Sequence, residues 1–462
     1  MSRHSVLLAT ALAVGAGILL SFNGCGTDSP VPHINSPISH IVIIFQENRT
    51  PDNLFQDPVL IARGADIASS GLNSHGQTIP LTPIPLANKY DLSHMHSAFV
   101  AMYDGGKMDG ANLIVDYCSR ENCLPNPQFK SVLPSDVQPY FSLAEQYTFG
   151  DRMFQTNEGP SYPAHQFILS GTSAPGPGSN LFVAENPFTV GFGPVGCTVA
   201  ASETVALIDP SGTETGSIYP CYEHETLTDL LDLSGATWRY YTPTPDSIWT
   251  APNSIRHMCQ PQGINGQLVC NSYEWKNNVV ISKTQVLTDI ANGELSNVNW
   301  VIPTGLASDH AGANNGSGPS WVAQVVNAIG NSPYWANTAI FISWDDWGGW
   351  YDHVPPPKVL KDCSEWGCGY VYGFRVPLIV VSPYAKAGYI SHVQHDFGSI
   401  LRFIEEDFGL GSLGYADAYA DDLSDCFNYK QTPLTFHTIA APLDAAYFLN
   451  DKTPPTPPDD DD

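Results

Sequence analysis

The sequence predicts one α/β domain with three layers, α/β/α, around a mostly parallel central sheet. Short runs of β-branched and apolar residues are spread over most of the chain, and they are typical of strands buried on both faces. Amphipathic helical patterns lie between these runs. Because strands that alternate with helices favour a parallel sheet covered on both sides, this arrangement indicates the fold class.

Four of the runs are the clearest strands, namely 38–45, 300–303, 338–343 and 376–382. Two helices have recognisable ends: one runs from Ser320 to Ile329 and stops at Gly330, and the other runs from Asp396 to Phe408 and stops at Gly409. Ligand sites in such folds gather beyond the carboxyl ends of the strands. That edge is therefore the place to look for chemistry.

The composition excludes several classes of protein. The chain has 462 residues, of which 43% are hydrophobic and 14% charged, so it can bury a large core and is not disordered. Its net charge of −27 opposes binding to nucleic acid, which relies on Lys and Arg at phosphates.

The two ends of the chain differ from the body. Residues 1–25, with Arg3 before an apolar run at 6–20, predict an export signal. Residues 26–37 would form a linker, 38–447 a single folded domain, and 448–462 a disordered tail rich in Pro and Asp.

Export implies a secreted, periplasmic or envelope-anchored protein with no transmembrane helix in the mature chain. Cys25 resembles the lipid-modified cysteine of bacterial lipoproteins, and the sequence leaves open whether it carries an anchor. Export also permits disulfides. Short spacings suggest four local pairs, with Cys426 free; the pairs are Cys118–Cys123, Cys197–Cys221, Cys259–Cys270 and Cys363–Cys368.

Polar residues follow two of the expected strands directly. Glu47 and Asn48 come after the strand at 38–45, and Asp345 and Asp346 come after the strand at 338–343. Adjacent carboxylates repel each other unless a cation lies between them, and oxygen ligands suit a divalent cation. The alternative is that the Asp pair caps a helix or faces solvent.

Ser161 lies at or just before the start of an expected helix that has Pro163 in its first turn. Unpaired N–H groups and the helix dipole at that end suit a phosphoryl group, and a coordinated metal can activate a serine hydroxyl. The alternative is an ordinary N-cap. Three histidines lie beside polar motifs and are candidates for proton transfer: His94, His310 and His353.

With these motifs the chain resembles the bacterial phosphoesterase family that includes phosphatidylcholine-type phospholipases C and a group of acid phosphatases. The resemblance covers residues 38 to about 408 and rests on six segments, at 47–50, 91–94, 106–110, 161–165, 308–310 and 344–353. It implies an alkaline-phosphatase-like fold. It also implies that Ser161 is a metal-contacting nucleophile, that His94 and His310 lie in the active site, and that the four polar strand-end residues bind the metal.

The resemblance also implies the function that we expect. This is a metal-dependent hydrolase of phosphoric esters that acts through a phosphoserine intermediate and resembles phospholipase C. The cation could be Ca²⁺, Mg²⁺, Mn²⁺ or Zn²⁺, and the substrate a phospholipid or a small phosphomonoester. The first alternative is an acid phosphatase acting on monoesters, and the second is a surface binding module without enzymatic activity.

Overall fold

A computed structural model describes Met1 and residues 36–119, 124–187, 194–361 and 365–455. The expected export signal, Cys25 and the last seven residues of the expected tail lie outside these ranges. The boundary expected at residue 447 falls inside a helix, α12 (Ala445–Asn450), whose Phe448 is buried against Trp321. No helix among the described residues is long and apolar enough to span a membrane.

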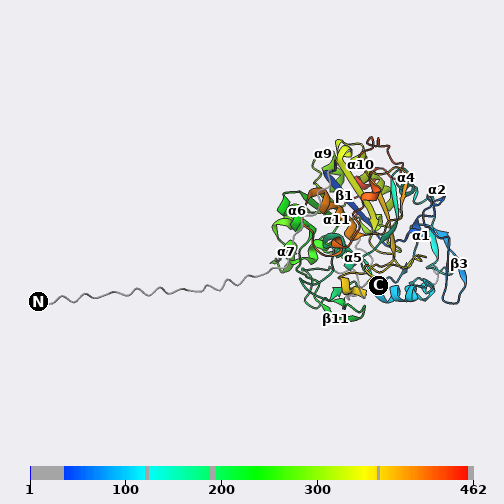
Figure 1. Cartoon of the computed structure of the whole chain (residues 1–462), viewed down its shortest axis with the longest axis horizontal. Helices are drawn as coiled ribbons and strands as arrows, with labels where there is room; N and C mark the ends of the chain where they lie inside the picture. The colour runs from blue at the N-terminus through cyan, green and yellow to red at the C-terminus, as the bar shows by residue number, and fades with distance from the viewer. Residues whose placement is uncertain (2–35, 120–123, 188–193, 362–364, 456–462) are drawn as a thin grey trace.

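A nine-stranded sheet forms the centre of the described structure (Figure 1). Its strands follow one another across the sheet in the order β15 (Val279–Ile281), β12 (Trp238–Thr242), β16 (Val298–Val301), β1 (His40–Gln46), β17 (Thr338–Trp344), β18 (Arg375–Val381), β8 (Thr148–Phe154) and β19 (Tyr389–Ser391), with β20 (His395–Asp396) also paired to β8. The strands from β15 to β17 are parallel. The expected mostly parallel sheet is therefore confirmed.

One strand of this sheet runs the other way. β18 is antiparallel to both β17 and β8, whereas β19 and β20 are parallel to β8. As a result β8 points in the same direction as β1 and β17, and the carboxyl ends of these three strands meet at one edge. The first residue of β18, Arg375, pairs with Phe154 at that same edge.

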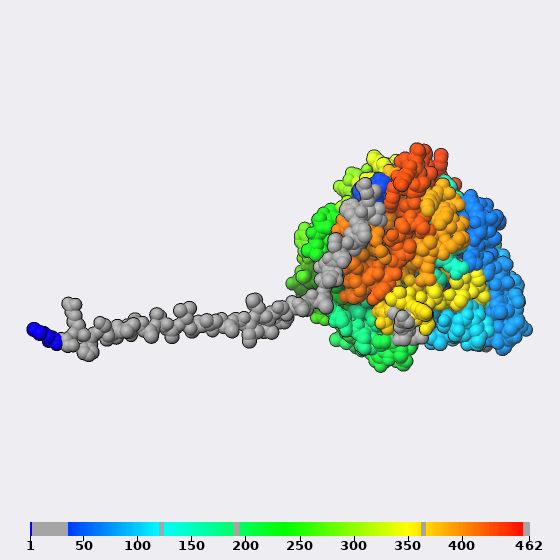
Figure 2. All heavy atoms as spheres, viewed as in Figure 1, coloured from blue at the N-terminus to red at the C-terminus, as the bar shows by residue number. Residues whose placement is uncertain are grey.

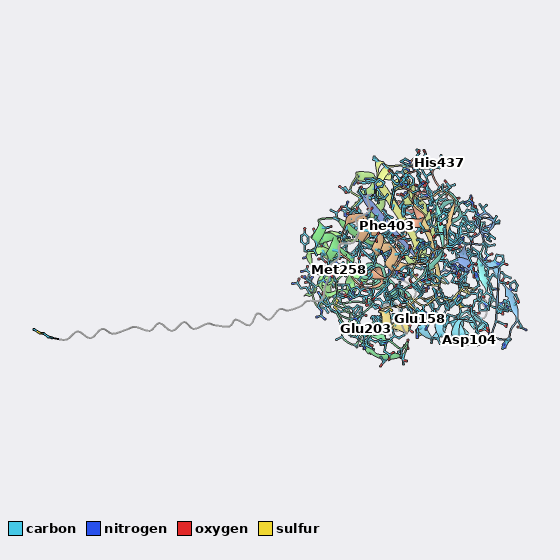
Figure 3. All side chains as sticks on the ribbon, in the orientation of Figure 1. Asp104, Glu158, Glu203, Met258, Phe403 and His437 are labelled. Atoms are coloured by element: carbon cyan, nitrogen blue, oxygen red, sulfur yellow. A yellow bond between two sulfur atoms is a disulfide. The ribbon has the colours of Figure 1, made fainter. Side chains whose placement is uncertain are left out.

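Helices cover both faces of the sheet, which gives the expected three layers. Successive side chains of a strand point to opposite faces. On β17, Phe341 packs against Phe403 of α11 (Phe397–Phe408), labelled in Figure 3, whereas Trp344 packs against Tyr140 of α4 (Gln138–Gln146). The two layers contain α5 (Ser161–Ser170) with α11, and α10 (Gly318–Gly330) with α4 and α9 (Gln285–Asn292).

The remaining segments are insertions and the C-terminal part of the chain. Five small sheets accompany the nine-stranded sheet among the described residues, and Figure 2 shows C-terminal residues, orange to red, spread over one face of the molecule. Two of the expected disulfides, Cys197–Cys221 and Cys259–Cys270, are confirmed, and Cys426 is free and buried. Cys118 and Cys368 are disulfide-bonded, whereas the partners expected for them, Cys123 and Cys363, lie outside the described residues.

Candidate functional site

The candidate site lies where β1, β17 and β8 end. Glu47 and Asn48 follow β1, Asp345 and Asp346 follow β17, and Ser161 begins the helix after β8. The first two loops are tied together by their backbones: Asp345 N donates to Gln46 O at 3.0 Å, and Arg49 N donates to Asp346 O at 3.0 Å. The carboxylates of the two loops are therefore held beside one another.

Close backbone contact requires a glycine in the second loop. Gly348 has φ +61°, and a Cβ added there would lie 2.5 Å from Asn48 O and Cβ. Asn48 itself adopts φ 61°, a left-handed conformation that Asn tolerates better than most residues. The Gly-Gly pair that follows the two aspartates thus allows their loop to pack on the Asn48 loop.

Three carboxylates and one hydroxyl converge at this edge, and we call Glu47, Asp345, Asp346 and Ser161 the Ser161 cluster. Ser161 Oγ lies 3.3 Å from Glu47 Oε2 and 3.2 Å from Asp346 Oδ2. Asp345 Oδ1 accepts hydrogen bonds from the backbone N–H groups of Asn48 and Asp346, at 3.0 and 2.8 Å. All four side chains are at most 1% exposed. Residues far apart in the sequence thus form one buried, acidic centre.

The ion-pair contacts of Glu47 and Asp345 in the described part of the chain are both with His165. Its Nε2 lies 3.2 Å from Glu47 Oε1 and 3.7 Å from Asp345 Oδ2. Burial lowers the pKa of His165 to about 4, so the ring is neutral at physiological pH and supplies no full positive charge. Burial and the neighbouring Asp345 and Asp346 raise the pKa of Glu47 well above its usual range. These carboxylates therefore repel one another.

A divalent cation fits this arrangement. Asn48 Nδ2 lies 2.9 Å from His94 Nε2, and Asn48 Oδ1 is buried without a hydrogen-bond partner among the described residues. Buried polar atoms without partners are rare in proteins and often mark ion sites. Oxygens that share a six-coordinate cation with bonds of about 2.1 Å lie about 3 Å apart, close to the separations around Ser161 Oγ. The donor set of carboxylate, amide and hydroxyl oxygens suits such an ion.

Ser161 occupies the first turn of α5, preceded by Pro160 as N-cap. Its hydroxyl points to the carboxylates of Glu47 and Asp346. The N-terminal N–H groups of a helix carry partial positive charge. The serine thus combines a helix N-terminus with contacts to two carboxylate oxygens.

His94 and His310 lie side by side, with ring centroids 5.8 Å apart. In each ring Nδ1 contacts a backbone carbonyl, Leu92 O at 2.9 Å or Ala311 O at 2.8 Å. A proton on Nδ1 makes that contact a hydrogen bond and leaves Nε2 of each ring for other partners. His94 Nε2 contacts Asn48 Nδ2, so this histidine adjoins the expected ligand set.

Arg49 connects the β1 loop to the segment that carries His310. Its guanidinium donates from Nε and Nη2 to Asp309 O at 2.9 and 2.6 Å, and it lies 5.0 Å over the ring of Trp350. The Asp309 carboxylate accepts from Tyr140 Oη and Trp344 Nε1. Arg49 thus positions the histidine loop.

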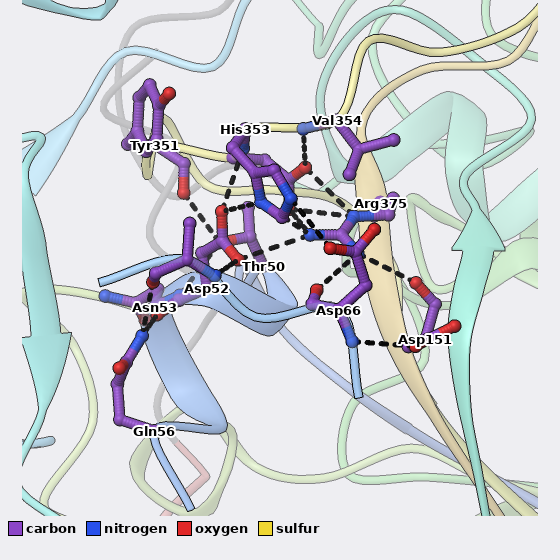
Figure 4. Close-up of polar contacts among 12 residues, drawn as sticks. Thr50, Asp52, Asn53, Gln56, Asp66, Asp151, Tyr351, His353, Val354 and Arg375 are labelled. Carbon is purple, nitrogen blue, oxygen red and sulfur yellow. Dashed lines mark hydrogen bonds and ion pairs between the residues drawn. The ribbon is translucent and has the colours of Figure 1, made fainter. Parts of the chain in front are cut away.

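His353, the third histidine candidate, lies in a different cluster (Figure 4). Its Nδ1 lies 2.7 Å from Asp52 Oδ2 and its Nε2 lies 3.0 Å from Asp66 Oδ1. Arg375 pairs with the same Asp52 and with Asp352. We call Asp52, Asp352, His353 and Arg375 the Arg375 cluster. These contacts include no member of the Ser161 cluster, and the catalytic role expected for His353 stays a prediction.

His165 was not among the residues expected at the site from the sequence. It lies four residues after Ser161 on α5, and positions i and i+4 share one face of a helix. That spacing is the sequence signal that could have identified it.

Comparisons with known proteins find similar sequences over most of the chain. The model of the Phosphoesterase family matches residues 38–411. Hemolytic phospholipase C of Pseudomonas aeruginosa is 25% identical over 85% of this chain and 56% of its own length. Phospholipase C B of Mycobacterium tuberculosis is 24% identical over 94% of this chain and 87% of its own length. The chain thus spans little more than half of the Pseudomonas relative.

Solved structures resemble the chain only distantly. A protein of the alkaline phosphatase superfamily from Vibrio parahaemolyticus is 10% identical, with a TM-score of 0.36 over 84% of this chain and 71% of its own. A lipoteichoic acid synthase from Listeria monocytogenes is 8% identical, with a TM-score of 0.36 over 83% and 76%. Similarity at this level carries no argument about function.

Proposed function

The chain belongs to the Phosphoesterase family, and from this premise we propose that it hydrolyses phosphoric esters with Ser161 as the nucleophile. The observation that carries the proposal is the position of the Ser161 hydroxyl. It lies at a helix N-terminus and within 3.3 Å of carboxylate oxygens from two different strand-end loops. A helix N-terminus attracts a phosphoryl group, and the acidic loops attract the cation that such chemistry commonly uses.

We propose that Glu47, Asn48, Asp345, Asp346 and Ser161 hold one or more divalent cations. Such an ion would supply positive charge that favours the serine alkoxide and neutralises phosphoryl oxygens. His165 provides a nitrogen next to two of these ligands, and its neutral form at physiological pH is compatible with a cationic neighbour.

The remaining steps belong to the chain's own side chains. The Ser161 hydroxyl passes its proton to a carboxylate that it contacts, Glu47 or Asp346, and Oγ forms a bond to phosphorus while the bond from phosphorus to the alcohol oxygen breaks. This gives a phosphoseryl enzyme and, once protonated, an alcohol. The rings of His94 and His310 lie 5.8 Å apart beside the site, and in their protonated forms they would donate to phosphoryl oxygens, with one of them protonating the leaving alcohol. Water then attacks phosphorus and gives a proton to the histidine that protonated the alcohol. The bond from phosphorus to Ser161 Oγ breaks, Oγ takes its proton back from the carboxylate, and the phosphorylated product leaves.

The relatives are phospholipases C, which suggests a phospholipid substrate. The hydrolysed bond would lie between glycerol and phosphate, and the released products would be a diacylglycerol and a phosphorylated head group. One observation also supports an acid phosphatase. The side chains of Trp344, Trp347 and Trp350, which lie close in sequence to Asp345 and Asp346, are fully buried. They pack in the core and form no apolar lip for lipid chains. A phosphomonoester needs no such lip.

The experiment compares Ser161→Ala with Ser170→Ala, a buried serine at the other end of the same helix. Turnover of choline phospholipid and of a small aryl phosphate is measured for both variants, each loaded in turn with Ca²⁺, Mg²⁺, Mn²⁺ or Zn²⁺. Ser161→Ala should lose at least about 10³-fold in kcat while keeping its fold, and acid quenching of the wild type during turnover should trap phosphoserine. Ser170→Ala should stay active.

Ordinary turnover by Ser161→Ala would reject this serine as the nucleophile. Hydrolysis of the aryl phosphate but not of the phospholipid would favour the phosphatase. Failure to hydrolyse either substrate with any of the cations would favour the binding module.

We also propose that the protein is exported, because its first 25 residues have the pattern of a signal peptide. The disulfides Cys197–Cys221 and Cys259–Cys270 agree with an oxidising compartment.

A further inference from the structure

A second cluster of metal-ligating side chains lies away from the acids around Ser161, at the end of the sheet formed by β19 and β20. It contains His395, Asp425 and Cys426, whose ligand atoms all lie within 4.8 Å of one another. Cys426 and His395 are fully buried, and Asp425 is about one-fifth exposed. We propose that these three residues bind a structural zinc ion, separate from the catalytic centre.

The separations between the ligand atoms match a tetrahedral zinc site. Zinc binds sulfur at about 2.3 Å and nitrogen or oxygen at about 2.0–2.2 Å, so tetrahedral geometry puts ligand atoms about 3.3–3.6 Å apart. His395 Nε2 lies 3.5 Å from Asp425 Oδ1, and Cys426 Sγ lies 3.5 Å from the same oxygen. The third separation, from Cys426 Sγ to His395 Nε2, is 4.0 Å. A shift of a few tenths of an ångström closes the site.

The residues around His395 favour the tautomer in which Nε2 carries a lone pair and can bind a metal. Nδ1 lies 2.8 Å from Asp421 Oδ1, and a carboxylate at this position favours the tautomer with the proton on Nδ1. Nε2, which then carries the lone pair, faces Asp425 and Cys426. Ser391 Oγ lies 3.0 Å from Nε2 and 2.6 Å from Asp425 Oδ2, so an oxygen is at hand for the fourth position.

The state of Cys426 is unusual in this chain. The other cysteines within the described ranges are disulfide-bonded, whereas Cys426 is free. Zinc binding would release the thiol proton to solvent, and the thiolate with the Asp425 carboxylate would balance the 2+ charge of the ion. Sulfur, nitrogen and oxygen ligands together favour zinc over Ca²⁺ or Mg²⁺.

The same residues also resemble a serine hydrolase triad, with Ser391 near His395 Nε2 and Asp421 near Nδ1. The hydrogen bonding argues against that role: Ser391 Oγ donates to Asp425 Oδ2 at 2.6 Å, so its proton is directed to the carboxylate and not to His395 Nε2 as a triad requires. A structural metal needs no such proton transfer. It would tie the 421–426 segment to the short strands β19 and β20, which end the sheet beyond β8.

Cobalt substitution tests the proposal, because a cobalt–thiolate bond gives a charge-transfer band in the near ultraviolet that oxygen and nitrogen ligands do not give. The full chain, stripped of metal and titrated with Co²⁺, should show this band. Cys426→Ser should abolish the band and lower bound zinc by about one equivalent per chain. Asp346→Asn, at the catalytic centre, should leave the band unchanged.

Asp425→Asn serves as a second variant, since Asp425 is partly exposed and its replacement preserves the shape of the side chain. It should weaken Co²⁺ binding at least about tenfold while far-ultraviolet circular dichroism stays as in the wild type. Absence of the band in the wild type, or its persistence in Cys426→Ser, would overturn the zinc site. In that case Cys426 would be a protonated thiol that donates a hydrogen bond to Asp425. None of these outcomes depends on whether Ser161 is the nucleophile.

Discussion

The loops after β1 and β17 build two acidic centres, and the two centres are balanced differently. In the Arg375 cluster, Asp52 and Asp352 face Arg375 and His353. In the Ser161 cluster, Glu47 and Asp345 face only the neutral His165 among the ion pairs of the described chain. The same two loops thus contribute to one centre whose acids are paired with cationic side chains and to another whose ion-pair partner in the described chain is neutral.

The antiparallel strand accounts for this difference. β18 begins at the edge where β1, β17 and β8 end, so its first residue, Arg375, enters the acidic region from the opposite direction. Its guanidinium donates to both oxygens of Asp352, to Asp52 Oδ1 and to the backbone carbonyls of Asp66 and Asp151. An acidic cluster at a strand end therefore indicates a metal only where no basic side chain reaches it.

Removing the guanidinium group of Arg375 should have the largest effect on stability. Arg375→Met leaves the buried Asp52 and Asp352 without their main partner, so we expect a loss of about 3–5 kcal/mol in the free energy of unfolding. Urea denaturation measures it. The matched control is Arg152→Met, which removes a half-exposed pair with Asp66 and should cost less than about 1 kcal/mol. Equal losses in the two variants would show that Arg375 does not balance a buried charge.

Neutralising one acid in each centre should have opposite effects in metal-free protein. Asp345→Asn keeps Oδ1, which accepts from Asn48 N and Asp346 N, and it puts an amide where Oδ2 faces Glu47 and His165. Relief of the repulsion should stabilise the metal-free chain by about 1 kcal/mol or more. Asp352→Asn, seven residues later, breaks a pair with Arg375 and should destabilise it. Thermal unfolding after chelation compares the two, and destabilisation by both would contradict the distinction between the centres.

The sequence is sufficient to predict what depends on local pattern and on the strand-end rule. It predicts the strands that become β1, β16, β17 and β18, the helices that become α10 and α11, and the convergence of Glu47, Asn48, Asp345 and Asp346. It does not predict that β18 runs antiparallel, because a buried strand has the same apolar pattern in either direction.

The sequence also does not predict contacts between residues that are far apart along the chain. His353 lies close in sequence to Asp345 and Asp346, yet it pairs with Asp52, 301 residues earlier. His395 and Cys426 carry no zinc-type spacing, and their proximity follows from the packing of the C-terminal segment on the sheet edge. Such contacts depend on tertiary structure rather than on any local pattern.

The smallest effect concerns the charge on His353 and its dependence on pH. The hydrogen bond and charge of Asp52, together with Asp352, raise the pKa of His353 to about 9 against the opposing effects of burial and of Arg375. A folded-state pKa above the unfolded value of about 6.5 stabilises the protein fully below that value, and the contribution is lost as pH rises through about 9. His353→Gln should therefore cost about 0.5–1 kcal/mol in the free energy of unfolding at pH 6 and little at pH 9.5.

The measurement is urea denaturation at both pH values, with His437→Gln as an exposed control that should show neither effect. A cost that does not change with pH would mean that His353 acts through packing alone, whereas a loss of turnover without any loss of stability would return it to the catalytic histidines.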